Sequence, residues 1–125
     1  MTAHDDSPRR ADPERATPET HVLDRLHAVI ASRHGADPDS SYTAKLLGQG
    51  PEKISKKLGE EAVEAVIEGV KGDRARLAEE SADVLYHMLV LWSAHGLEPD
   101  TVWHALEKRL GTSGIAEKKA RNKQA

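Results

Sequence analysis

Five acidic residues are spaced in a way that suits metal chemistry. Glu60, Glu61 and Glu64 form an E-E-x-x-E pattern, and Glu80 and Asp83 form an E-x-x-D pattern. Side chains three positions apart lie on one face of a helix, so the members of each spaced pair point the same way. Both patterns lie beside apolar positions of their helices, where an isolated charge is costly. These carboxylates are therefore the first candidates for a functional site.

The two acidic patterns can meet in space. The segments that carry them are joined by a turn of one or two residues, which requires two antiparallel helices. Converging carboxylates repel one another, and a hard divalent cation relieves that repulsion. Glu61, Glu64, Glu80 and Asp83 are predicted to hold Mg²⁺, with Mn²⁺ as a substitute. The same spacing also fits a solvated helix face that pairs with lysines, so spacing alone leaves both interpretations open.

A group of lysines precedes the first acidic pattern. Lys53, Lys56 and Lys57 lie one to three turns before Glu61, where they could contact phosphate oxygens. The i,i+4 spacing of Lys56 with Glu60, and of Lys57 with Glu61, also predicts ordinary ion pairs along a helix. Spacing alone favours the ion pairs.

Composition excludes several classes of function. The 125 residues include no Cys, which excludes disulfides, thiolate zinc sites and a cysteine nucleophile. The net charge of −3 and the few aromatic residues do not indicate binding to nucleic acid. No apolar run approaches the ~18 residues of a membrane span, and the first residues lack the apolar core of a signal peptide. We expect an intracellular, cytoplasmic protein with no membrane partner.

Hydrophobic periodicity predicts an all-α fold. No stretch alternates with a period of two for long enough to be a convincing strand. The predicted helices cover residues 23–34, 42–47, 52–71, 73–95 and 99–110. The architecture expected from them is an antiparallel helix bundle of four main helices plus the short helix at 42–47, with the two long helices at its centre.

The long helices carry more apolar residues than one buried face needs. On the first long helix, one apolar stripe consists of Ile54, Leu58, Ala62, Ala65 and Gly69. A second stripe on its far side consists of Val63, Ile67 and Val70. On the second long helix the stripe consists of Leu77, Ser81, Val84, Leu85, Met88 and Trp92, with Val90 and Leu91 off it. Because a chain of this size has too few helices to cover both sides, we expect a dimer or tetramer.

Composition also divides the chain into segments. Residues 1–20 are charged and proline-rich and have no Leu, Ile, Val or aromatic residue, so they cannot offset the entropy of ordering and are predicted to be disordered. Residues 21–116 form the predicted all-α domain. Residues 117–125 are predicted to be a basic C-terminal tail.

Four sequence blocks accompany the acidic patterns: Ser41-Tyr42-Thr43-Ala44-Lys45-Leu46, Lys53-Ile54-x-x-Lys57-x-Gly59-Glu60-Glu61-Ala62, Ala82-Asp83-Val84-Leu85-Tyr86-His87 and Ser113-Gly114-Ile115-x-Glu117-Lys118. With these blocks the chain resembles the phosphoribosyl-ATP pyrophosphatase family of histidine biosynthesis, which belongs to the all-α NTP pyrophosphatase superfamily. The superfamily pattern is the E-E-x-x-E followed by E-x-x-D. The resemblance extends from about residue 23 to residue 121.

This resemblance implies an activity and roles for the residues. The family hydrolyses the α–β phosphoanhydride of phosphoribosyl-ATP and releases phosphoribosyl-AMP and pyrophosphate. The implied ligands of Mg²⁺ are the same four carboxylates, and the implied catalytic residues are Glu60, Glu61 and Glu64, with Glu60 or Glu64 accepting the proton of the attacking water. The implied substrate-binding residues are Lys45, Lys53, Lys56 and Lys57. A homodimer is also implied.

Two alternatives remain open from the sequence. The first is a housecleaning pyrophosphatase of the same superfamily that acts on free or damaged nucleotides. The second is a helical interaction module that binds another polypeptide through its additional apolar stripes. The block around Tyr42 and the block around Gly114 argue against the first alternative.

Overall fold

The structure, a computed structural model, describes residues 21–110 and Arg121. The described part of the chain contains helices and turns but no strand, which confirms the predicted all-α class. Its helices are α1 (Val22–Ala31), α2 (Tyr42–Gln49), α3 (Pro51–Lys71), α4 (Arg74–Ala94) and α5 (Pro99–Glu107). None of them is both long enough and apolar enough to cross a membrane. The predicted disordered segment at 1–20, the block around Gly114 and most of the basic tail at 117–125 lie outside the described residues.

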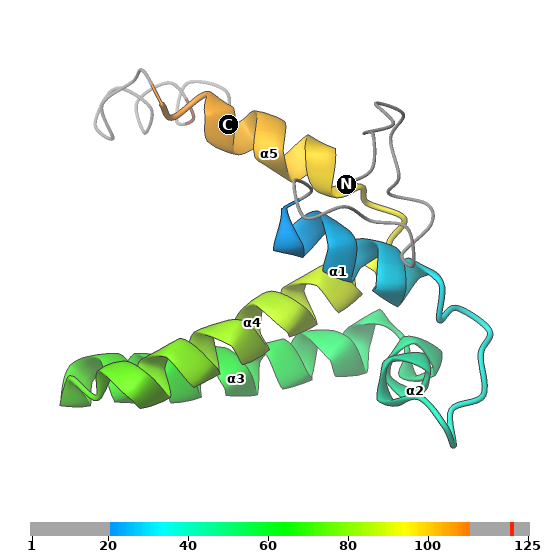
Figure 1. Cartoon of the computed structure of the whole chain (residues 1–125), viewed down its shortest axis with the longest axis horizontal. Helices are drawn as coiled ribbons and strands as arrows, with labels where there is room; N and C mark the ends of the chain where they lie inside the picture. Colours follow the sequence, from blue (N-terminus) through cyan, green and yellow to red (C-terminus); the bar gives the residue numbers. More distant parts are fainter. Residues whose placement is uncertain (1–20, 111–120, 122–125) are drawn as a thin grey trace, which may run out of the picture.

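A tight turn sets α3 and α4 side by side in opposite directions (Figure 1). Gly72 ends α3 in the left-handed conformation, with φ 76°, which a glycine adopts without steric penalty. Asp73 then begins α4, because its side chain accepts a hydrogen bond of 3.1 Å from the backbone N–H of Arg76. The antiparallel pair that the sequence predicted is therefore confirmed.

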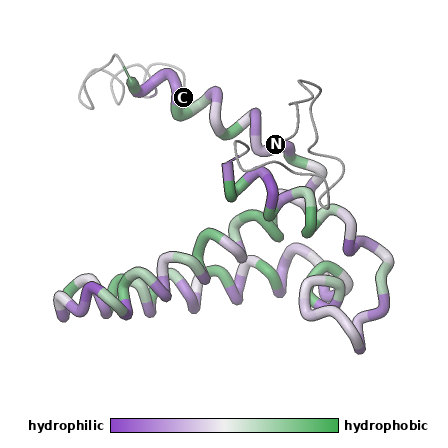
Figure 2. The backbone as a smooth tube through the Cα atoms, in the orientation of Figure 1, coloured by the Kyte–Doolittle hydropathy of each residue, from purple (hydrophilic) through white to green (hydrophobic). Residues whose placement is uncertain are grey.

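The hydrophobic core lies at one end of this long helical pair. Five buried side chains from four helices form it: Ile30, Leu46, Ile54, Leu89 and Val90. The short helix α2 packs on α3 and α4, while α1 crosses the C-terminal half of α4, where hydrophobic residues follow one another along the chain (Figure 2). The core thus holds the start of α3 and the end of α4 in fixed register. This register determines which acidic residues of the two helices lie opposite one another.

One aromatic side chain of the last helix contacts both α4 and α1. The ring of Trp103 meets Trp92 edge-on, with ring centroids 5.8 Å apart. Its Nε1–H donates a hydrogen bond of 3.1 Å to Asp24 on α1. The helix ends at Glu107 rather than at residue 110, and α1 ends at Ala31 rather than at residue 34.

The predicted apolar stripes need correction. On α3 the buried residues are Ile54, Glu61 and Glu68, which repeat every seven positions, whereas Gly69 is exposed. On α4 Leu85 is 46% exposed, although the predicted stripe included it, and Val90 is fully buried, although it was placed off the stripe. The reason is that α1 covers a side of α4 that periodicity alone does not select. The far half of the helical pair has no other described helix against it, and the predicted four-helix bundle stays a prediction.

Candidate metal centre

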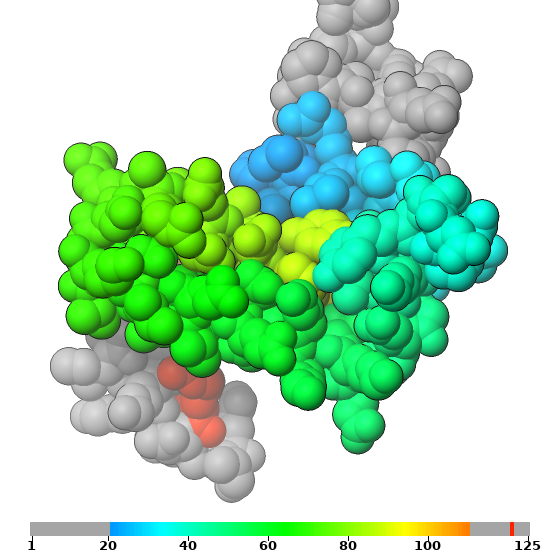
Figure 3. Space-filling model, turned by 90° about the horizontal axis from the view of Figure 1, so that it is seen from below, coloured from blue at the N-terminus to red at the C-terminus, as the bar shows by residue number. Residues whose placement is uncertain are grey.

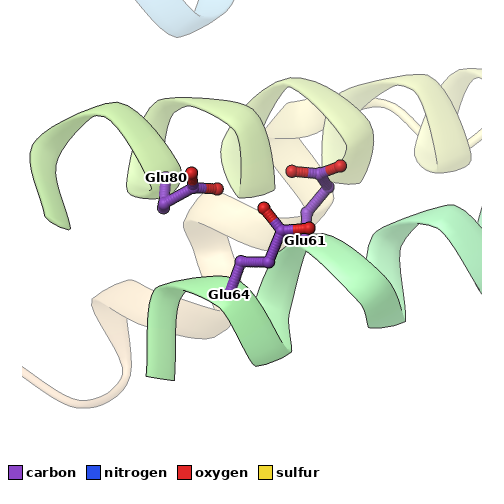
Figure 4. Close-up of side chains that lie close together, drawn as sticks. All are labelled: Glu61, Glu64 and Glu80. Carbon is purple, nitrogen blue, oxygen red and sulfur yellow. The ribbon is translucent and has the colours of Figure 1, made fainter. Parts of the chain in front are cut away.

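Three glutamates from the two long helices converge. Glu61 and Glu64 project from α3, and Glu80 projects toward them from α4 (Figure 4). One carboxylate oxygen from each lies within 4.8 Å of the others. The i,i+3 spacing on α3 aligns the first two residues, and the antiparallel pairing brings the third opposite them. The convergence predicted from the acidic patterns is confirmed for these three residues.

The surroundings of these carboxylates fit a hard divalent cation. Glu61 and Glu80 are buried, at 8% and 7% exposure, while Glu64 is exposed and gives access from solvent. The Oε1 atom of Glu80 is buried and has no hydrogen-bond partner within the described residues, so its desolvation is uncompensated. Burial, and then the negative charge of Glu64, raise the pKa of Glu80. Carboxylate oxygens that lie close together, with negative charge that is not fully balanced, are the ligands that Mg²⁺ and Mn²⁺ prefer.

Two other predicted acidic residues lie outside this group. Asp83 is exposed, and the structure does not bring its carboxylate into the cluster of three, although its charge contributes to the raised pKa of Glu80. Glu60 is exposed one position before Glu61 and also lies outside the cluster. A metal role for Asp83 and a catalytic role for Glu60 therefore stay predictions.

Of the three lysines that precede the acidic pattern on α3, one forms an ion pair within the described residues. Lys57 Nζ lies 3.4 Å from Glu61 Oε2, which confirms the predicted i,i+4 ion pair. The hydrogen bond to Glu61, and that carboxylate's charge, raise the pKa of Lys57, so it stays cationic beside the cluster. Lys53 and Lys56 are exposed, and within the described residues neither forms an ion pair, so the predicted i,i+4 pair of Lys56 with Glu60 is wrong. Lys45 on α2 is exposed as well.

Two residues that sequence reasoning missed border the cluster. Glu68 is a buried carboxylate, 7% exposed, two turns after Glu61 on the same face of α3. Arg76 on α4 lies between it and the cluster, with Nε 3.5 Å from Glu68 Oε2 and Nη2 3.7 Å from Glu80 Oε2. The i,i+4 spacing of Arg76 and Glu80 could have predicted their contact within α4. The contact of Arg76 with Glu68 joins two helices, so no local spacing indicates it.

Comparison with known proteins identifies the family. The family model for phosphoribosyl-ATP pyrophosphohydrolase matches residues 23–110. A relative from Azospirillum brasilense named phosphoribosyl-ATP pyrophosphatase is 63% identical over 100 residues, which are 80% of this chain and 90% of the relative. Relatives of the same name from Cereibacter sphaeroides and Paramagnetospirillum magneticum are 63% and 54% identical and are each covered over 97% of their length. This chain belongs to the phosphoribosyl-ATP pyrophosphohydrolase family.

The match to the pyrophosphohydrolase family covers the whole candidate site. Residues 23–110 include both acidic patterns, the lysines of α3 and the short helix α2. The resemblance seen in the sequence blocks is thereby confirmed for the described domain. His87 is buried on α4, and its Nδ1–H donates a hydrogen bond of 2.7 Å to the backbone carbonyl of Asp83.

The raised pKa of Glu80 predicts how pH affects this family member without metal. An unfolded glutamate titrates near pH 4.5, and Glu80 in the folded chain titrates at higher pH. Above pH 4.5 there is therefore a window in which Glu80 holds its proton more in the folded chain than in the unfolded chain. The contribution of Glu80 to the free energy of unfolding should fall as pH rises through that window, because burial, and then the negative charges of Glu64, Asp83 and Glu61, disfavour its ionised form in the folded chain. Glu80→Gln should remove this decline.

Thermal unfolding of both proteins in EDTA, from pH 4 to pH 8, measures the effect. The melting temperature of Glu80→Gln minus that of the original protein should increase with pH. A difference that stays constant or decreases with pH would show that burial and repulsion do not govern this carboxyl.

Proposed function

We propose that this protein hydrolyses the α–β phosphoanhydride of phosphoribosyl-ATP, giving phosphoribosyl-AMP and pyrophosphate, the second step of histidine biosynthesis. The observation that carries the proposal is the convergence of Glu61, Glu64 and Glu80 within 4.8 Å in a chain of this family. Relatives named for that activity align with this chain over 90% and 97% of their length. The site and the family therefore support one reaction.

The same proposal includes Mg²⁺ as the cofactor, with Mn²⁺ as a substitute. Glu61, Glu64 and Glu80 would hold the ion, with Asp83, which lies outside the cluster, as the proposed fourth ligand. When bound, the ion neutralises phosphate charge and lowers the pKa of a coordinated water. The support for this part is the uncompensated Oε1 of Glu80 and the all-oxygen donor set.

Other residues have distinct roles in the proposal. Lys57, held beside Glu61 at 3.4 Å, and the exposed Lys53 and Lys56 bind phosphate oxygens and stabilise the leaving pyrophosphate. Glu64 accepts the proton of the attacking water, because it is the exposed member of the cluster and water reaches it. Glu60 lies outside the cluster and is less well placed for that role.

We also propose that two copies of the chain pair through α3. Four large apolar side chains on this helix are exposed: Val63 by 58%, Val66 by 64%, Ile67 by 48% and Val70 by 84%. In the space-filling view from below, α3 (green) lies on the near face of the molecule, where no other described helix covers it (Figure 3). A contiguous apolar surface of this kind is rarely left open to water. A homodimer covers it with the same face of a second copy.

One assay tests the proposed activity. Purified protein and Mg²⁺ are incubated with phosphoribosyl-ATP, ATP or dCTP, and released pyrophosphate is measured. We expect release from phosphoribosyl-ATP alone, and none when EDTA replaces Mg²⁺. Comparable release from ATP and dCTP would instead indicate a housecleaning pyrophosphatase. No release from any of the three would contradict the proposed reaction.

A further inference from the structure

Arg76 and Glu68 form a charged link between the two long helices that none of the roles above uses. Glu68 is buried on α3, on the side of the cluster nearer the turn. It continues the seven-residue repeat of buried positions that begins with Ile54 and Glu61. A buried carboxylate is costly unless a cation or hydrogen bond compensates it. Lys71 Nζ, 3.6 Å from Oε1, and Arg76 Nε, 3.5 Å from Oε2, supply opposite charge, although Oε1 has no hydrogen-bond partner within the described residues.

The same arginine reaches the candidate metal ligand. Its Nη2 lies 3.7 Å from Oε2 of Glu80, the oxygen opposite the buried Oε1 that has no partner. One guanidinium therefore touches one carboxylate on each helix. Its planar group presents Nε and Nη2 in fixed geometry, whereas a lysine ammonium is a single point charge. Both carboxylates are buried, whereas the arginine side chain is 55% exposed, so solvent screens these contacts in part.

We propose that Arg76 is a positioning residue for the metal centre: anchored on Glu68, it holds Oε2 of Glu80 and leaves Oε1 directed to the cation. This inference rests on the proposed metal site. Carboxylates that bind metals are commonly held by a second contact on the other oxygen, and loss of such a contact typically weakens metal binding about 10–100-fold. The guanidinium also offsets the repulsion among the glutamates before a cation arrives.

The test measures binding of Mn²⁺ to the metal-free protein by calorimetry, without substrate. Arg76→Gln is expected to raise the dissociation constant about 10-fold, at the lower end of the effect of such contacts. Arg76→Lys should recover only part of this loss, because it keeps the charge but cannot contact both carboxylates. Arg74→Gln is the matched control: it removes one positive charge two residues away, where no ion pair forms within the described residues, and binding should be unchanged.

Two further variants separate the explanations. Glu68→Gln keeps Arg76 and Glu80 but removes the anchor, and it should weaken Mn²⁺ binding more than Glu79→Gln, which removes the same charge from an exposed glutamate of α4 outside the cluster. Glu61→Gln should weaken binding strongly, because it removes a ligand. A purely structural role would lower the melting temperature without changing the dissociation constant measured well below it.

The outcomes are distinct. Unchanged or tighter Mn²⁺ binding in Arg76→Gln, or full recovery in Arg76→Lys, would overturn the positioning role while the metal centre stands. If the original protein binds no Mn²⁺, the metal centre and this inference both fail. Weaker binding in Arg76→Gln and Glu68→Gln, with unchanged binding in Arg74→Gln, supports the proposal.

Discussion

Replacing Glu61 by Gln is expected to reduce pyrophosphate release from phosphoribosyl-ATP by at least about 100-fold. Loss of a contact that only supports a metal ligand typically costs about 10–100-fold in activity, and loss of a ligand itself should cost at least the larger value. The variant keeps the shape of the side chain and removes its charge. It therefore loses a buried carboxylate of the cluster and the ion pair with Lys57. The helices should remain folded, because one member of a repelling acidic group has been neutralised.

Steady-state assays with saturating Mg²⁺, combined with circular dichroism, measure this prediction. Glu79→Gln is the matched control, since Glu79 is an exposed glutamate on α4 outside the cluster, and its removal changes the net charge equally. The control should retain full activity. Activity of Glu61→Gln within a few-fold of the original protein would exclude the carboxylate cluster as the catalytic centre.

Replacing Val66 by Glu is expected to weaken the proposed homodimer by at least about 100-fold, or roughly 2.8 kcal/mol. Val66 is 64% exposed in the single chain and lies between Val63 and Val70 on α3. A two-fold interface places the new carboxylate in the contact twice. Burying a charge without a partner typically costs about 3–5 kcal/mol. The residues three and four positions away are uncharged, so the helix itself offers no ion pair.

Sedimentation velocity over a concentration series compares the variant with the original protein. Val22→Glu serves as the control, because Val22 is similarly exposed, at 58%, but lies on α1 away from the apolar face of α3. The control should sediment as a dimer and Val66→Glu as a monomer. A monomeric original protein, or a Val66→Glu variant that dimerises as tightly, would contradict pairing through this face.

Much of the site follows from local rules that the sequence contains. Gly72 and Asp73 end one long helix and begin the next, and their tight turn makes the helices antiparallel. Helical periodicity then places Glu61 and Glu64 on one face and brings Glu80 opposite. The pairing of Lys57 with Glu61 has the same origin, because i,i+4 neighbours on a helix are in reach whatever surrounds them.

The sequence by itself therefore determined the helices, their antiparallel pairing and the convergence of three glutamates. The tertiary structure alone decided which helix faces are covered, because that depends on segments distant along the chain: Val90, which periodicity placed off the apolar stripe, is buried in a core to which α1, α2 and α3 also contribute. It also decided that Asp83 stays outside the cluster, and that Arg76 joins Glu68 to Glu80. Periodicity fixes directions around one helix axis, whereas a contact between helices also depends on how far apart they lie and on how each is rotated.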